Sequence, residues 1–217
     1  MTELTLEQID LDGAIREALD NVSGDTRAAF LRKSVIAGGG LVGGGIALAA
    51  FPREARAATK GDVAILNFAL TLEFLEASFY YYSVILGALS GPAKTMARVI
   101  YQHEQAHVNF LRKALGSAAV KKPKFNFQGT VEDQDLFLST AQLLEDTGVG
   151  AYAGAAPSVK DDAILSAAVS VHSVEARHAA WVRHMLGNPP APVAFDKPIK
   201  GADVLAAVRS TKFIVGF

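Results

Sequence analysis

The most constraining feature of this sequence is an internal repeat that carries acidic residues and histidines at matching positions. When Glu73 is aligned with Glu145, leucine lies one and seven residues before each glutamate, and tyrosine lies seven residues after it. When Glu104 is aligned with Glu175, histidine lies three residues after each. The two pairs are 72 and 71 residues apart. Two copies of one helical hairpin account for this repeat.

Apolar residues recur every three or four positions in four stretches, which is the periodicity of helices with one buried face. We expect helices near residues 62–89, 92–115, 132–156 and 158–186. Short links join the first helix to the second and the third to the fourth, whereas a longer link joins the second to the third. The sequence therefore predicts an all-α fold, a four-helix bundle with one long crossover. An irregular C-terminal tail with a short helical stretch near 203–209 follows it.

The repeated polar residues interrupt the apolar faces of these helices. On the second helix, Glu104 and His107 lie between Ile100 and Leu111, at offsets that place all four on one side. Buried carboxylates beside buried imidazoles are unfavourable unless their charges are compensated, so this pattern calls for cations. One glutamate from each of two helices and Glu-x-x-His from each of the others is the ligand set of a dinuclear carboxylate site. The predicted metal ligands are Glu73, Glu104, His107, Glu145, Glu175 and His178.

Composition and ligand chemistry restrict the metal and the function. The chain of 217 residues has no cysteine, which excludes disulfide frameworks, thiolate zinc sites, iron–sulfur clusters and cysteine nucleophiles. Oxygen and imidazole ligands suit iron or manganese, so we expect two iron ions, with manganese as the alternative. The net charge is −1 at pH 7, and no basic excess indicates nucleic-acid binding.

Further residues are expected beside the site. The repeated tyrosines, Tyr80 and Tyr152, are predicted to donate hydrogen bonds to the ligating carboxylates, although tyrosines packed in the core would give the same pattern. Glu76 lies one turn beyond Glu73 and is either an extra ligand or a neighbouring or surface-paired carboxylate. Its repeat partner is Gly148, which favours the second role. The remaining histidines have no repeat partner and are expected to face solvent or to lie beside the ligands: His103, His172 and His184.

Residues 1–57 have the composition of an export leader, and residues 58–217 are expected to form the helical domain. No charged residue occurs from Ser34 to Pro52, and these 19 residues include six glycines. Ala55-Arg56-Ala57 then matches a small-x-small cleavage site. The preceding residues resemble a twin-arginine signal at Thr26, Arg27, Phe30, Leu31 and Arg32, but Ala28 replaces the second arginine.

This leader predicts an exported protein, periplasmic or extracellular, with the export machinery as a partner. The alternative is an uncleaved membrane anchor, because 19 helical residues would span roughly 28 Å, close to the thickness of a bilayer core.

The motifs Leu72-Glu73-Phe74-Leu75-Glu76, Glu104-Gln105-Ala106-His107 and Val174-Glu175-Ala176-Arg177-His178 resemble those of the ferritin-like superfamily. The resemblance is closer to its exported branch, related to plant desiccation-related proteins, and covers about residues 60–209. It implies that Glu73 and Glu145 are terminal ligands, that Glu104 and Glu175 bridge two metals, and that His107 and His178 are terminal imidazoles. It implies no catalytic residue beyond these ligands.

Members of this superfamily oxidise ferrous iron or reduce oxygen or peroxide at such centres. The resemblance therefore implies a di-iron oxidoreductase, ferroxidase or peroxidase-like, with a small oxidant as partner. Because ferritin-like bundles often pair along helix faces, it also suggests a homodimer.

Two other functions fit the same residues. A stress or envelope protein could retain the bundle with a structural or vestigial metal site and no turnover. Residues 103–107 also satisfy the zinc protease pattern H-E-x-x-H, with His103 and His107 as ligands and Glu104 as the base. The repeat argues against the zinc hydrolase, because Val174 stands at the position that corresponds to His103.

Overall fold

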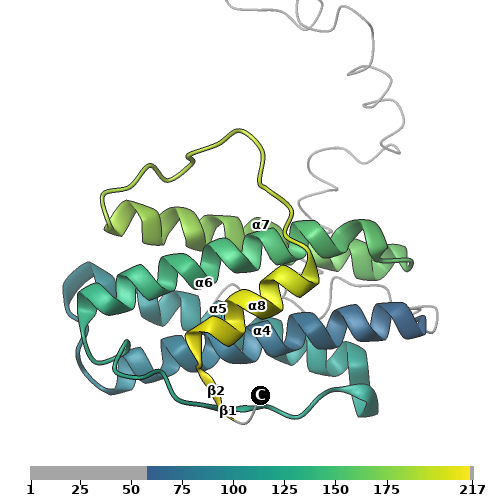
Figure 1. Ribbon diagram of the computed structural model, residues 1–217, viewed down its shortest axis with the longest axis horizontal. Coiled ribbons are helices and arrows are strands. Elements are labelled where there is room, and N and C mark those ends of the chain that lie inside the picture. Colours follow the sequence, from purple (N-terminus) through teal and green to yellow (C-terminus); the bar gives the residue numbers. More distant parts are fainter. Residues whose placement is uncertain (1–57, 216–217) are drawn as a thin grey trace, which may run out of the picture. The chain divides into compact units, whose positions relative to one another are not determined.

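The computed structural model describes residues 58–215, and the predicted leader lies outside them. Four long helices and one short helix dominate this part of the chain (Figure 1). The elements are α4 (Lys60–Ile85), α5 (Gly91–Leu115), η1 (Gly116–Ala118), β1 (Lys124–Phe125), α6 (Gln134–Ala155), η2 (Ala156–Ser158), α7 (Asp162–Met185), α8 (Gly201–Thr211) and β2 (Ile214–Val215). The predicted all-α class is confirmed.

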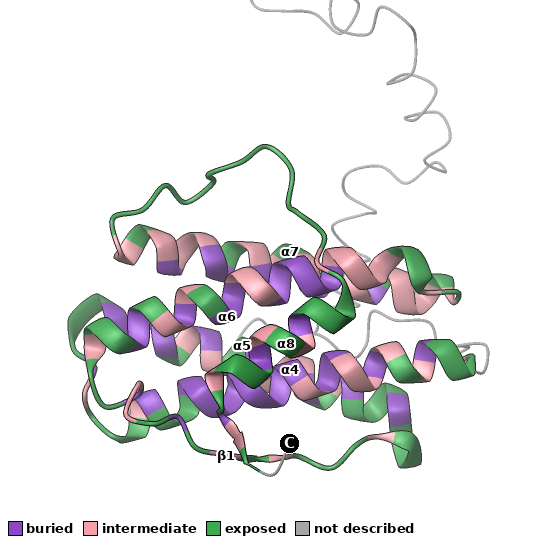
Figure 2. Cartoon of the chain, in the orientation of Figure 1, coloured by how far each residue is buried: buried purple, intermediate pink, exposed green. Residues whose placement is uncertain are grey.

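The long helices pack as two hairpins, α4 with α5 and α6 with α7, and the long crossover runs between α5 and α6 (Figure 1). Their apolar faces turn inward (Figure 2). Of the helices within residues 58–215, α4 alone has the length and hydropathy of a membrane span, and 67% of that stretch is buried inside the bundle. This matches its place as a core helix.

Helix ends differ from the predicted ones where a glycine or a side-chain cap decides them. The first helix was expected to reach Leu89 but ends at Ile85, because Gly87 adopts a left-handed φ of +79° that breaks the helix. The third helix begins at Gln134 because the carboxylate of Asp133 accepts the N–H groups of the first turn.

The fourth helix begins at Asp162, later than the expected residue 158. Residues 156–158 form a separate 3-10 turn, and the carboxylate of Asp161 then caps the new helix.

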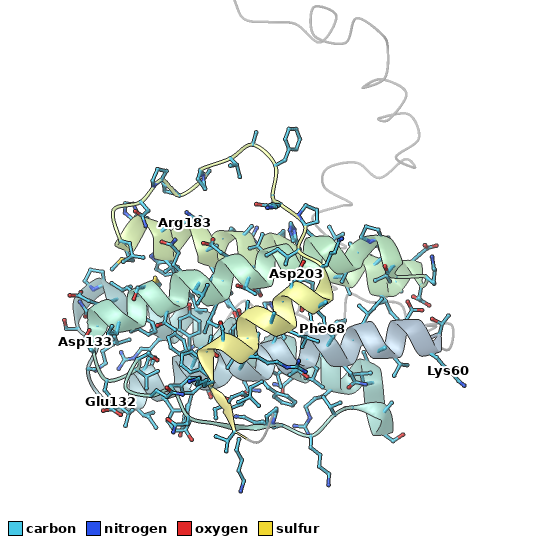
Figure 3. All side chains as sticks on the ribbon, viewed as in Figure 1. Lys60, Phe68, Glu132, Asp133, Arg183 and Asp203 are labelled. Atoms are coloured by element: carbon cyan, nitrogen blue, oxygen red, sulfur yellow. The ribbon has the colours of Figure 1, made fainter. Side chains whose placement is uncertain are left out.

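The C-terminal tail is irregular from Gly187 to Lys200. Beyond it, α8 is longer than the predicted stretch and packs on the bundle through the buried residues Val204 and Val208. It begins over Phe68 of α4 (Figure 3), since a Cβ on Gly201 would lie 3.9 Å from Phe68 Cζ. The tail ends in β2, which pairs antiparallel with β1 of the crossover.

The tail reaches α8 through a backbone contact with α6 that requires glycine. Ile199 N donates a hydrogen bond to the carbonyl of Gly150 at 2.9 Å. A Cβ on Gly154 would overlap the Ile199 carbonyl oxygen, and a Cβ on Gly150 would lie 3.2 Å from the Lys197 carbonyl oxygen. Glycines in the middle of a helix are unfavourable by about 1 kcal/mol each relative to alanine. Here they let the tail lie directly against the helix backbone.

Candidate metal centre

Each long helix brings acidic or imidazole side chains to the middle of the bundle. Glu73 lies on α4, Glu104 and His107 on α5, Glu145 on α6, and Glu175 and His178 on α7. All four carboxylates are completely buried, and His178 is 2% exposed. Two apolar clusters lie on either side, one containing Ile100 and Leu144, the other Leu70 and Leu111. The structure therefore brings all six predicted residues together.

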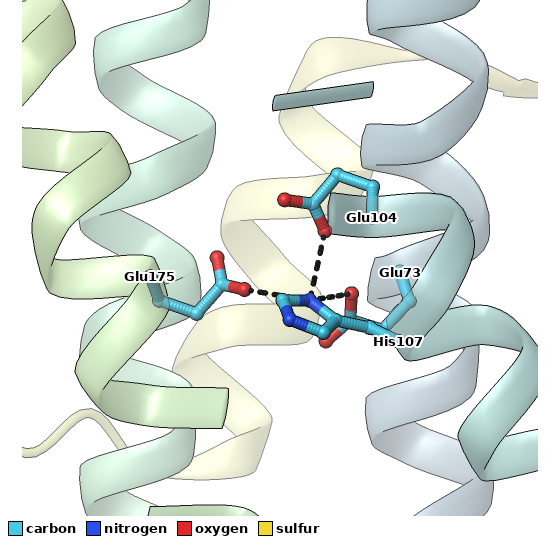
Figure 4. Close-up of side chains that lie close together, drawn as sticks. All are labelled: Glu73, Glu104, His107 and Glu175. Atoms are coloured by element: carbon cyan, nitrogen blue, oxygen red, sulfur yellow. Dashed lines mark hydrogen bonds and ion pairs between the residues drawn. The ribbon is translucent and has the colours of Figure 1, made fainter. Parts of the chain in front are cut away.

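The first group surrounds the imidazole of His107 (Figure 4). His107 Nδ1 lies 3.2 Å from Glu73 Oε2, 3.4 Å from Glu104 Oε2 and 3.1 Å from Glu175 Oε1. One N–H can point at only one of these oxygens. The three oxygens therefore converge on this nitrogen more closely than its own hydrogen bonding requires.

The second group surrounds the imidazole of His178. His178 Nδ1 lies 3.0 Å from Glu104 Oε1, 3.5 Å from Glu145 Oε2 and 3.9 Å from Glu175 Oε2. Glu104 and Glu175 thus belong to both groups, and each turns one oxygen toward each imidazole. In each group, one ligand atom per residue lies within 4.8 Å of the others.

The polar atoms of this cluster are suited to bind cations. The following buried atoms have no hydrogen-bond partner: both carboxylate oxygens of Glu104 and of Glu175, Glu145 Oε2 and His178 Nδ1. Buried polar atoms are seldom left unpaired in proteins. An octahedral ion with bonds of about 2.1 Å separates neighbouring ligand atoms by about 3.0 Å, close to the spacings seen here. The cluster is compatible with a metal site, and its oxygen-rich donor set suits iron or manganese.

Burial and charge act on the ionisation of the shared carboxylates. Burial raises the pKa of Glu104 well above its usual range, and the charges of Glu175 and Glu73 add to the rise. Burial also raises the pKa of Glu145, to about 7. For Glu175, burial acts to raise the pKa, but its contacts with the two imidazoles outweigh this and lower it to about 2.

The pKa values of the two imidazoles are raised, whereas burial alone lowers the pKa of a histidine. Burial acts to lower the pKa of His178, but the charge of Glu145 and the contact with Glu104 raise it to about 12. Burial likewise opposes protonation of His107, and the charge of Glu73 again outweighs it and raises the pKa. The buried carboxylates thus favour the positively charged form of both imidazoles.

The two repeated tyrosines hydrogen-bond across the bundle. Tyr80 of α4 donates its hydroxyl proton to Glu145 Oε1 of α6 at 2.6 Å. Tyr152 of α6 donates to Glu73 Oε1 of α4. Each carboxylate is thereby held by the hairpin that does not carry it. Burial raises the pKa of both tyrosines, so both hydroxyls keep their protons and remain donors.

Glu76 lies beside the cluster, in space that a glycine provides. Its side chain is 4% exposed, and it belongs to neither of the two groups. A Cβ on Gly148 would lie 3.2 Å from Glu76 Oε1 and 3.5 Å from Glu175 Oε2. Burial and the charge of Glu175 raise its pKa well above the usual range. The pseudo-symmetric site is therefore asymmetric at this position, with a carboxyl group in one repeat and bare backbone in the other.

The three other histidines lie outside both groups. His103 is exposed, but its Nδ1 lies 2.9 Å from Nε2 of His178 and the two rings are stacked. His172 lies 3.8 Å from a carboxylate oxygen of Asp196, and His184 is exposed. Because His103 stacks on His178 and shares no group with His107, the described residues do not assemble the zinc site of an H-E-x-x-H hydrolase.

The sequence named His103 and Gly148 but did not give their contacts. His103 both faces solvent and lies beside a predicted ligand, and its contact with His178, which joins α5 to α7, leaves no periodic trace because the other repeat has valine at this position. The role of Gly148 has a signal in the sequence, since a glycine within an apolar helix that aligns with a glutamate marks a close approach of a side chain.

The comparison with known families agrees with this geometry. A model of the ferritin-like domain matches residues 61–188, which include the four long helices except Lys60 and every residue of both groups. No curated protein matches the chain. Since the match covers more than half of the sequence, the chain belongs to the ferritin-like domain family.

Proposed function

We propose that this protein binds two iron ions, with manganese as the alternative, and oxidises ferrous iron with oxygen or peroxide. The observation that carries the proposal is the sharing of Glu104 and Glu175. Each turns one oxygen toward His107 and the other toward His178. A single metal would not require carboxylates that face two ways.

In this proposal, the six clustered residues divide between two metal positions. Glu73 and His107 would hold the ion at one position, and Glu145 and His178 would hold the ion at the other. Glu104 and Glu175, which belong to both groups, would contribute an oxygen to each. The charges of Glu73 and Glu145 raise the pKa of the His107 and His178 imidazoles, so a metal at Nδ1 would compete with a proton for the same lone pair.

When bound, the two ferrous ions together would supply two electrons to the oxidant, because each would give up one electron. The chain's own residues position and shield them. The tyrosine hydroxyls fix the orientation of Glu73 and Glu145. The apolar clusters on either side exclude water from the bundle centre.

Anaerobic loading with ferrous iron, followed by oxygen or peroxide, tests this function on the full chain. We expect rapid formation of ferric iron in the parent protein and its loss in Glu104→Gln/Glu175→Gln. Glu132→Gln is the matched control, because Glu132 is an exposed glutamate at the surface. Slow oxidation that is equal in all three proteins would refute the oxidoreductase.

The second candidate is an envelope or stress protein in which the metal is structural or vestigial. The short contacts of both imidazole nitrogens with buried carboxylate oxygens favour it, because they pair the polar atoms of the cluster without a metal. The same experiment separates the two. Metal binding without accelerated oxidation would establish the noncatalytic function.

We also propose that the protein is exported and belongs to the branch related to plant desiccation-related proteins. Support for export comes from the sequence of residues 1–57. The mass of the protein recovered from an expressing bacterium tests it, since cleavage after Ala57 gives a defined product. A full-length chain in the membrane fraction would establish the anchor instead. Light scattering on the same product tests the proposed homodimer.

A further inference from the structure

An open pocket lies on the first hairpin, where the C-terminal end of α5 meets the crossover. It measures about 620 Å³, and sites for small molecules commonly measure about 300–1,000 Å³. Its wall contains no acidic residue and four cationic ones: Arg112, Lys113, Lys121 and Lys122. None of the six clustered residues of the metal centre lines it, so it is a separate site.

The four cations of this pocket lack acidic partners. None of them forms an ion pair with any residue in the described part of the chain. Burial lowers the pKa of Lys122, and no carboxylate opposes that effect. The negative end of the α5 dipole attracts Arg112 and Lys113, which lie in the last turn of the helix. It does not account for Lys121 and Lys122, which lie beyond that helix in the crossover.

The surface around the pocket is positive as well. Residues 58–131 include eight lysines and arginines, and each is at least partly exposed. The acidic residues of the same stretch are all buried: Asp62, Glu73, Glu76 and Glu104. A surface of one sign steers ions of the opposite sign toward it and raises their local concentration. The first hairpin therefore attracts anions to the side on which the pocket opens.

One side chain of α4 fixes the part of the crossover that carries two of the lysines. Asn67 Nδ2 donates a hydrogen bond to the carbonyl of Ala118 at 2.9 Å, and Val120 N donates to Asn67 Oδ1 at 2.8 Å. Both bonds lie immediately before Lys121 and Lys122 in the chain. Holding this backbone in place lowers the entropy that a ligand must remove when it orders the lysines. The pocket is thus formed in part before a ligand binds.

The polar groups of the wall are hydrogen-bond donors. They are the four cations and the amide of Asn109. Gln105 Nε2 donates to Asn109 Oδ1 at 3.3 Å, which occupies the acceptor of that amide and leaves its NH₂ group as a donor. Donors without acceptors suit an anion that has several oxygens. A phosphate group offers three acceptor oxygens and a charge of about −1.5 to −2, so two of them match four cations.

We propose that this pocket binds a small organic molecule that carries two linked phosphate groups, as a nucleoside diphosphate does. The planar guanidinium of Arg112 can hold two phosphate oxygens at once, and the lysines supply the remaining positive charge. The organic part would lie against the apolar residues of the wall, which are Phe74, Ala119 and Val120.

Calorimetric titration of the metal-free full chain with ADP tests the pocket, because without metal the phosphates have no ion to bind. We expect one site per chain, with binding that weakens as salt is added. Lys121→Gln/Lys122→Gln should weaken binding by roughly tenfold or more, since hydrogen bonds to charged groups contribute on this scale. Lys94→Gln/Arg98→Gln is the control. It removes the same charge from α5 outside the pocket wall and should bind ADP as the parent does.

The outcomes of this titration are distinct. Absence of ADP binding by the parent would overturn the proposal. An equal loss in both double variants would also overturn it, because the effect would then come from the general charge of the surface. Both variants replace side chains that are exposed or half-exposed, so the fold should be retained, and circular dichroism checks this.

Two further measurements separate a formed pocket from a charged surface. Asn67→Ala keeps every charge but releases the crossover, so it should weaken ADP binding, and an unchanged affinity would contradict a formed pocket. Inorganic pyrophosphate should bind more weakly than ADP, since it lacks the part that meets the apolar residues. Sedimentation with phosphatidylglycerol vesicles tests a membrane as the source of phosphate. Binding to vesicles without binding to ADP would overturn the pocket and establish a membrane-docking surface instead.

Discussion

Removing the hydroxyl of Tyr152 tests how the cluster is held together. Tyr152→Phe deletes the donor to Glu73 Oε1 and keeps the ring, so no cavity forms. Tyr80→Phe makes the equivalent change at Glu145 Oε1 in the other repeat. Because both carboxylates are completely buried, no water can replace the lost donor.

The size of the effect follows from these contacts. Leaving a buried acceptor without its donor costs about 1–3 kcal/mol, and more when the acceptor is charged. We therefore expect each substitution to lower the free energy of unfolding of the metal-free protein by about 2 kcal/mol. For a domain of this size, that corresponds to roughly 4–8 °C in the melting temperature.

Urea denaturation followed by circular dichroism measures this loss on the full chain. Tyr82→Phe is the control, because Tyr82 lies on the same helix as Tyr80 and its side chain is 41% exposed. The loosened carboxylates should also weaken metal binding by about 10- to 100-fold. If Tyr80→Phe and Tyr152→Phe unfold at the same urea concentration as Tyr82→Phe, the hydroxyls do not hold the carboxylates and the reasoning is wrong.

Three further predictions concern stability. Gly154→Ala should lower the stability of the domain by about 1–3 kcal/mol, because the new Cβ would overlap the Ile199 carbonyl oxygen. At a helical glycine with free space around it, the same substitution would raise the stability by about 1 kcal/mol. Thermal unfolding shows whether the melting temperature falls or rises. Asp62→Asn should destabilise the domain by about 1 kcal/mol at pH 7, because both carboxylate oxygens of Asp62 accept hydrogen bonds, one from Lys160 N and the other from Thr59. These bonds lower the pKa of Asp62 in the folded state, so the difference in stability should be present above about pH 4, the pKa of the unfolded carboxyl, and should disappear as the pH falls through the folded value. Denaturation at several pH values checks this. Chelation should lower the melting temperature, because a metal at 100 times its dissociation constant stabilises by about 2.7 kcal/mol per site, and an unchanged melting temperature would contradict metal binding to the folded state.

The sequence predicts the bundle well because the periodicity that indicates each helix lies within one short segment of the chain. Helical periodicity places Ile100, Glu104 and Leu111 on one face, and the repeat shows that the same pattern serves a second hairpin. Grouping Glu104 with Glu175 required only that the faces of two such hairpins meet. The structure brings these residues together as that argument requires.

Contacts between segments that are distant in the chain could not be predicted from the sequence. The place of Glu76 depends on the missing side chain of Gly148 on another helix, and the repeat shows only that this glycine aligns with Glu76, not that the two approach each other. The docking of Ile199 on Gly150 is a backbone contact, which the identity of the tail residues does not encode. The end of α4 at Ile85 depends on the left-handed conformation of Gly87 rather than on the hydrophobic pattern.

The metal-free charge balance explains why such a cluster can fold before it binds metal. His107 and His178 lie among four buried carboxylates, and the charges of Glu73 and Glu145 raise the pKa of their imidazoles, which favours the positive form. A divalent ion brings more charge to the same place and satisfies the unpaired oxygens of Glu104 and Glu175. Metal binding should therefore replace protons rather than reorganise the helices.

The most direct test of the central claim is a crystal structure of the iron-loaded full chain with anomalous diffraction at the iron edge. Our account predicts two ions per chain, one about 2.0–2.3 Å from His107 Nδ1 and the other at the same distance from His178 Nδ1, with Glu104 and Glu175 contacting both. A single ion held by His103 and His107, or no ion in the bundle centre, would contradict it.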